Sequence, residues 1–184
     1  MYVVFCLNFE ELKMTDSDLS RPMILIIEDD PETLNLNKIN LKMVLKLDDD
    51  QILVATDAEA AKTLLTENKD RIRLIVSDGQ FPQLATRSIR EDESLFAGLN
   101  SFLQPLLEPQ FQERLTNGSL GLIVFSGVQK SKITQFFTRI PKWQYVEKPD
   151  SRLLRGQAQT TWQEAIRMPG EFAQSDRMHG TRIE

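Results

Sequence analysis

Acidic residues follow two apolar runs of the chain, and their types could support metal-assisted chemistry. The run MILII is followed directly by Glu28, Asp29 and Asp30. The run LIV is followed, after one serine, by Asp78. Carboxylates that lie close together repel one another, and a divalent cation relieves that repulsion. Magnesium is the natural cation, because it binds through one or two carboxylates together with waters and phosphate oxygens.

A hydroxyl and a lysine follow two later apolar runs. Ser126 comes directly after LIVF, and Lys148 comes soon after WQYV. An aspartate can act as a nucleophile and form an aspartyl-phosphate. The loose transition state of that reaction spreads charge over three oxygens, which a metal, an ammonium group and hydrogen-bond donors can stabilise. The four sites together predict phosphoryl transfer to a carboxylate.

Each site also has a purely local explanation. Asp30-Pro31-Glu32 is a good helix start, with an aspartate cap, a proline at the first position and an acid in the first turn. The other three sites are ordinary turn or strand-end signals when taken alone. The local explanations do not predict that all four sites follow apolar runs in this order.

The apolar runs and the segments between them predict the elements that position these residues. Unbroken apolar runs are typical of strands that are covered on both faces, and the segments between them have helical spacing. Strands that alternate with helices predict a parallel sheet in a three-layer, doubly wound α/β domain, whose ligand site lies at the carboxyl ends of the strands. The predicted strands are 23–27, 52–55, 74–76, 122–125 and, more weakly, 143–146. The predicted helices are 31–47, 58–68, 95–115 (interrupted by Pro105 and Pro109), 130–140 and 151–168.

The composition excludes several classes of protein. The chain has 184 residues and a formal net charge of −5, which indicates one domain and argues against a general nucleic-acid binder. Cys6 is its one cysteine, so an internal disulfide framework is excluded and a reducing cytoplasm is expected. His179 is its one histidine, which disfavours catalysis by a histidine pair or a His-Cys dyad. We expect neither a membrane span nor a secretory signal.

The four motifs as a set resemble the receiver domain of bacterial two-component response regulators. The resemblance runs from about residue 23 to residue 168 and implies a three-layer α/β/α flavodoxin-like fold with a five-stranded parallel sheet in the order 2-1-3-4-5. It implies a stand-alone receiver in a phosphorelay that catalyses only its own phosphorylation and dephosphorylation. The motifs are IIEDDP, VSDGQFP, VFSG and YVEKP.

The resemblance also assigns the metal site. Asp78 is the implied phosphoacceptor, and Glu28 and Asp29 are the implied acidic pair. Asp29 would be the more direct ligand of Mg²⁺ and Glu28 would act through water. An acidic pair shifted to Asp29 and Asp30 is the alternative, although Asp30 is better placed as a helix cap. The backbone carbonyl of Gln80 would complete the protein ligands.

Three further residues take roles in the implied switch. Lys148 would form an ion pair with the phosphoryl group, and Ser126 would be the hydroxyl that moves toward it. Tyr145 matches the switch aromatic, with an ordinary half-buried strand tyrosine as the alternative. Receiver domains display the change on the surface formed by the fourth predicted helix, the fifth strand and the last helix.

The chain departs from the receiver pattern beside the phosphoacceptor. The glycine expected soon after Pro82 is matched only by Gly98, so a loop is inserted around 83–97. This insertion could be a lid, a partner contact or a tolerated surface loop. We expect 1–22 to be an N-terminal extension, with Met14 and Met23 as alternative starts, and 169–184 to be a C-terminal tail.

Several partners and competing functions follow from the resemblance. A histidine kinase or a histidine phosphotransfer protein would supply the phosphoryl group, and a downstream protein effector would bind the switched surface. The last helix is expected to pack in the core, with a homodimer through this helix and the fifth strand as a second use. No direct contact with nucleic acid or membrane is expected. The alternatives are a receiver-like module that binds partners without phosphorylation, a flavodoxin-like nucleotide binder and a hydrolase that uses Asp78 as its nucleophile.

Overall fold

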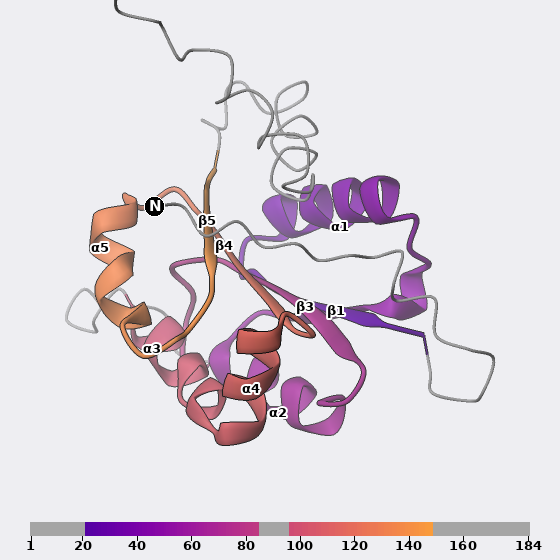
Figure 1. Cartoon of the computed structure of the whole chain (residues 1–184). Helices are drawn as coiled ribbons and strands as arrows, with labels where there is room; N and C mark the ends of the chain where they lie inside the picture. The colour runs from indigo at the N-terminus through magenta and orange to yellow at the C-terminus, as the bar shows by residue number, and fades with distance from the viewer. Residues whose placement is uncertain (1–20, 85–95, 149–184) are drawn as a thin grey trace, which may run out of the picture.

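A five-stranded, all-parallel sheet crosses the computed structural model, which describes residues 21–84 and 96–148 (Figure 1). Its strand order is β2-β1-β3-β4-β5, so the predicted fold class and strand order are confirmed. The strands are β1 (Met23–Ile27), β2 (Ile52–Ala55), β3 (Ile72–Ser77), β4 (Gly121–Ser126) and β5 (Gln144–Glu147).

The register of the sheet brings the carboxyl ends of the strands to one edge. Ile27 at the end of β1 pairs with Ser77 at the end of β3. Backbone hydrogen bonds continue this pairing beyond the strands, because the Asp78 amide donates to the Ile27 carbonyl at 2.8 Å. The Lys148 amide donates to the Ser126 carbonyl at 3.0 Å. Residues that directly follow different strands are therefore held beside one another.

Two hydrophobic layers cover the faces of the sheet. Among the described helices, α1 (Pro31–Leu45) packs on one face, through Leu41 against β1 residues such as Ile24 and Ile26. The remaining helices contribute to the core on the opposite face, as Figure 1 shows. They are α2 (Ala58–Glu67), α3 (Ala97–Leu103), α4 (Pro109–Asn117) and α5 (Lys130–Thr134). Because both faces are covered, the strands carry the unbroken apolar runs seen in the sequence.

The first two helices begin at aspartate caps that directly follow loops from the sheet. Asp30 accepts a hydrogen bond from the Thr33 amide at 2.7 Å. Asp57 accepts one from the Ala60 amide at 2.8 Å. These side chains satisfy amide groups that have no partner within the helix. The caps fix where α1 and α2 begin, a few residues after the carboxyl ends of β1 and β2.

Two predicted helices differ from the structure. The segment predicted as one interrupted helix over 95–115 divides at its prolines into α3, a short 3₁₀ turn and α4. The helix predicted over 130–140 is too long, because α5 ends at Thr134 and continues only as a 3₁₀ turn over Gln135–Phe137. The threonines and consecutive phenylalanines of this segment have low helix propensity. The fifth strand lies one residue later than predicted.

Other predictions lie outside the described residues. These are the last helix, the N-terminal extension, the C-terminal tail and most of the inserted loop. In the part of the chain that the structure describes, no helix combines the length and apolar character that crossing a membrane requires.

Candidate functional site

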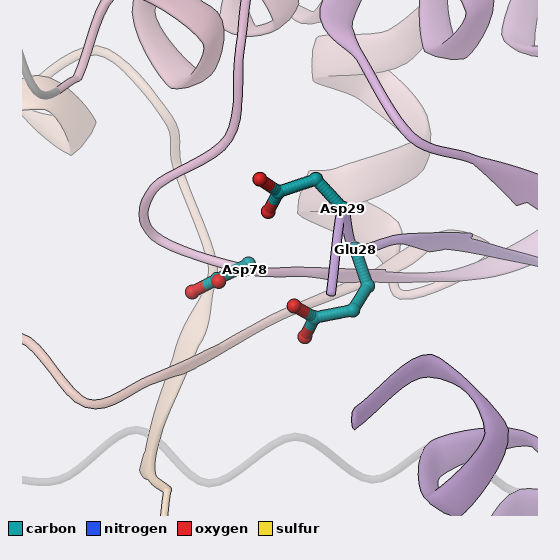
Figure 2. A group of neighbouring side chains, drawn as sticks. All are labelled: Glu28, Asp29 and Asp78. Carbon is teal, nitrogen blue, oxygen red and sulfur yellow. The ribbon is translucent and has the colours of Figure 1, made fainter. Parts of the chain in front are cut away.

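Three carboxylates meet where β1 and β3 end. Glu28 and Asp29 directly follow β1, and Asp78 directly follows β3 (Figure 2). Each of them offers an oxygen that lies within 4.8 Å of the others. Glu28 is buried, Asp29 is exposed and Asp78 is intermediate. An oxygen-only cluster of this kind suits a hard divalent cation and leaves an open side for water or phosphate oxygens.

Lys148 joins two of these acids. Its Nζ lies 2.8 Å from Glu28 Oε2 and 2.8 Å from Asp78 Oδ2. The lysine side chain is 20% exposed, whereas the Glu28 side chain is only 2% exposed. A buried carboxylate needs a compensating charge, so Lys148 balances part of the negative charge of the cluster.

The electrostatics of the cluster favour exchange of a proton for a cation. Burial raises the pKa of Glu28 to about 7; the Asp78 charge adds to this shift, while Lys148 opposes it. Asp29 is exposed as a residue, but partial desolvation of its carboxyl raises its pKa, and the Asp78 charge adds to this shift. Burial lowers the pKa of Lys148, but attraction to Asp78 and Glu28 outweighs it, so the net shift is upward. The positive charge of a bound cation favours the ionised form of a nearby carboxyl, so cation binding near neutral pH would release a proton from Glu28.

Both carboxylate oxygens of Asp78 have defined partners. Oδ1 accepts a hydrogen bond from the Gly79 amide at 2.5 Å, and Oδ2 accepts one from Lys148. The backbone of Asp78 is also held, because its carbonyl accepts a hydrogen bond from the Ser77 hydroxyl at 2.7 Å. The side chain is thus oriented by its own strand end and by the lysine that follows β5.

Asp30 lies outside the three-acid cluster. Its side chain caps α1, and the hydrogen bonds from Thr33 lower its pKa. The geometry therefore groups Asp78 with Glu28 and Asp29 rather than with the shifted pair of Asp29 and Asp30. Gln80 follows Gly79 in the same loop and is half-buried, and the role of its carbonyl as a ligand stays a prediction.

Ser126 and Tyr145 are linked at the neighbouring strand ends. Ser126, the last residue of β4, is 1% exposed, and its Oγ accepts a hydrogen bond from the Val128 amide at 3.2 Å. The Tyr145 hydroxyl donates to the Val128 carbonyl at 2.7 Å and is 3.2 Å from the Ser126 carbonyl. Burial raises the pKa of Tyr145. Tyr145 thus holds the loop that directly follows the predicted switch hydroxyl, and its role as a switch stays a prediction.

Two glycines shape the loop after Asp78. At Gly98, a Cβ atom would collide with the Phe81 carbonyl, so the first turn of α3 packs directly on this loop. Gly98 is the glycine that the sequence matched to the receiver pattern beyond the insertion. At Gly79, a Cβ atom would lie 2.5 Å from Ser126 Oγ. The sequence predicts only a turn at Asp78-Gly79 and does not predict this close packing. A glycine directly after a candidate nucleophile was the available signal.

The comparisons with known proteins identify the fold. The sequence matches no protein-family model and no curated protein sequence. The structure is similar to the Mn²⁺-bound form of response regulator Rcp1, with 17% identity, a TM-score of 0.50 and coverage of 80% of this chain and 99% of that chain. The chain therefore has the fold of a response regulator receiver domain.

Two further receiver structures are similar at lower TM-scores. One is the signal receiver domain of an HD domain-containing protein from Pseudomonas fluorescens Pf-5, with 19% identity, a TM-score of 0.46 and coverage of 80% of this chain and 95% of that chain. The other is a response regulator receiver domain protein from Clostridium thermocellum, with 18% identity, a TM-score of 0.46 and coverage of 79% and 94%.

Proposed function

We propose that this protein is a response regulator receiver in a phosphorelay and accepts a phosphoryl group on Asp78. The observation that carries the proposal is the placement of Lys148, whose Nζ lies 2.8 Å from both Asp78 and Glu28. The Lys148 ammonium group therefore lies beside both the candidate nucleophile and one of the candidate metal ligands. The receiver fold supports the proposal but does not by itself define the chemistry.

The proposed reaction is a single displacement at phosphorus. A carboxylate oxygen of Asp78 forms an O–P bond while the P–N bond to the histidine of a kinase or phosphotransfer protein breaks. The departing imidazole then takes up a proton. The Gly79 amide orients the carboxylate, and the Lys148 ammonium is close enough to pair with oxygens of the incoming group.

The same residues would serve a metal cofactor. Glu28, Asp29 and Asp78, with the Gln80 carbonyl, would hold Mg²⁺, which when bound supplies positive charge to the phosphoryl oxygens. Glu28, the most buried of the acids, would act through a water molecule, and exposed Asp29 would bind directly. The oxygen-only donor set fits this ion.

Phosphorylation would change the surface around Tyr145. A phosphoryl group adds roughly −1.5 to −2 charges and three acceptor oxygens. Ser126 would turn toward it, and its movement would alter the loop whose Val128 carbonyl accepts the Tyr145 hydrogen bond. A cytoplasmic protein effector would bind this changed surface. A dimer contact through β5 and the helix predicted over 151–168, which lies outside the described residues, stays a prediction. No contact with nucleic acid or membrane is proposed.

Labelling with a small phosphodonor tests the proposal. Purified protein is incubated with Mg²⁺ and acetyl phosphate, and its intact mass is measured before and after treatment with hydroxylamine, which cleaves acyl phosphates. We expect one added phosphoryl group in the wild type, and none in Asp78→Asn. Asp49→Asn is the matched control, because Asp49 is an exposed aspartate paired with Lys42. Protein that stays unlabelled while a known receiver is labelled would instead indicate a module that binds without phosphorylation.

A further inference from the structure

Gly79 packs directly against the residues that would respond to phosphorylation. A Cβ atom added to Gly79 would lie 2.5 Å from Ser126 Oγ, 2.7 Å from Ile133 Cδ1 and 2.9 Å from Ser126 Cβ. Real Cβ atoms do not approach other atoms this closely, so a side chain at this position would have to displace a neighbour. The φ angle of Gly79 lies outside the left-handed region. The glycine is therefore required by the space and not by the backbone conformation.

The neighbours of Gly79 have little freedom to move. The Ser126 hydroxyl accepts a hydrogen bond from the Val128 amide, and the Ser126 carbonyl accepts one from the Lys148 amide. Ile133 is fully buried in α5 and belongs to the main hydrophobic core. The easiest adjustment to an added methyl group is rotation of the Ser126 hydroxyl or of the Ile133 end methyl, since the serine Cβ is held by its strand.

Gly79 also contacts the candidate nucleophile. Its amide donates to Asp78 Oδ1, on the opposite side of the carboxylate from the oxygen that binds Lys148. Gly79 thus donates its amide to the Asp78 carboxylate and has no room for a Cβ atom beside the Ser126 hydroxyl and Ile133 of α5. This is a direct steric connection between the acceptor, the hydroxyl and the helix.

We propose that Gly79 is a positioning residue for the Ser126 hydroxyl. Its missing side chain leaves the space that the hydroxyl occupies beside Gly79, the residue that directly follows Asp78. The inference rests on the proposed function and adds a residue to it. A methyl group at this position turns the hydroxyl away and slows transfer, although it removes no polar group.

A comparison of two glycines provides the first test. Gly79→Ala is compared with Gly127→Ala, since a Cβ at Gly127 would meet nothing within 4 Å. With acetyl phosphate and Mg²⁺, we expect Gly79→Ala to lower the labelling rate by about tenfold, consistent with misplacing one group that contacts the transferring oxygens. We expect Gly127→Ala to keep the wild-type rate. Mg²⁺ affinity, measured by calorimetry, should be unchanged in both variants, because Ser126 is not a proposed metal ligand.

A double-mutant cycle distinguishes positioning from general damage. Ser126→Ala removes the atom nearest to the added methyl group, so Gly79→Ala should then cause little further loss of rate. Gly79→Ala should also lower the unfolding midpoint less in the Ser126→Ala variant than in the wild type. Equal slowing by Gly79→Ala in both backgrounds would overturn the inference, as would parallel loss of Mg²⁺ binding or an unchanged rate.

The two proposals fail in different ways. If the wild type is not labelled, the proposed function fails, and positioning for transfer fails with it. If the wild type is labelled and Gly79→Ala is labelled at the same rate, only the role of Gly79 is wrong.

Discussion

The Lys148 ammonium lies 2.8 Å from Asp78 Oδ2, although the two residues are 70 positions apart in the sequence. The same Nζ atom contacts Glu28, which is 120 positions away. Because β1, β3 and β5 run in the same direction, the residue that follows each strand arrives at one edge. The ion pairs therefore depend on the sheet topology and would be lost with it.

Removal of the lysine charge should destabilise the protein when no divalent cation is present. In Lys148→Met, Glu28 and Asp78 lose their shared partner, and we expect the free energy of unfolding to fall by about 1–3 kcal/mol. Urea unfolding in EDTA measures the loss. Lys62→Met is the control, because its 2.8 Å pair with Glu59 is on the surface and should contribute less than about 1 kcal/mol. Equal effects of the two variants would contradict the account of the site.

Two adjacent aspartates should differ in their effect on metal binding. Asp29→Asn removes a carboxylate from the cluster, and we expect it to weaken Mg²⁺ binding by about tenfold or more, a typical effect of perturbing a metal site. Asp30→Asn should leave the affinity nearly unchanged, because asparagine can also cap α1. Isothermal titration calorimetry measures both. A larger effect for Asp30→Asn would favour the shifted acidic pair.

The cap of α1 should contribute a pH-dependent part of the stability. Asp30→Ala removes the bond to the Thr33 amide and should cost about 1 kcal/mol at pH 7. The pKa of Asp30 is lowered in the folded protein, so its ionised form stabilises the fold above about pH 4. This contribution is lost as the pH falls through the folded pKa.

Asparagine at the same position separates this effect from general acid unfolding. Asp30→Asn retains a cap that does not titrate, so its stability relative to the wild type should increase below about pH 4. Urea unfolding at a series of pH values measures the difference. A constant difference between the two proteins across this range would be inconsistent with an ionised aspartate cap.

The Tyr145 hydroxyl should stabilise the loop after β4. Tyr145→Phe removes its bonds to the Val128 and Ser126 carbonyls, and we expect a loss of about 0.5–1.5 kcal/mol. Amide hydrogen exchange at Val128 should become faster, since this amide bonds to Ser126 in the same loop. Unchanged stability and exchange would show that the tyrosine does not hold the loop.

The sheet was the most predictable part of the fold. The strands over 23–27 and 52–55 have the predicted bounds, because each apolar run is covered on both faces and ends at polar residues. The apolar pattern of α1 was less informative about which face of the helix packs on the sheet. Asn37 and Asn40 are buried there, whereas Ile39 and Met43 are 46% and 51% exposed, so apolar spacing alone does not identify the packed face.

The candidate site could be predicted as a set of residues but not as a set of contacts. The order of strand ends indicated that Glu28, Asp78 and Lys148 would converge. It could not show that one ammonium group contacts both acids, or that Ser126 fills the space beside Gly79. Such contacts depend on side-chain positions across different strands, which a single sequence does not encode locally.

Trapping the phosphorylated residue tests the central claim most directly. Protein treated with Mg²⁺ and acetyl phosphate is reduced with borohydride, which converts an aspartyl phosphate to homoserine, and its peptides are sequenced by mass spectrometry. The account predicts homoserine at position 78, and no homoserine in Asp78→Asn. Homoserine at a different aspartate, or none in a wild-type protein that binds Mg²⁺, would contradict it.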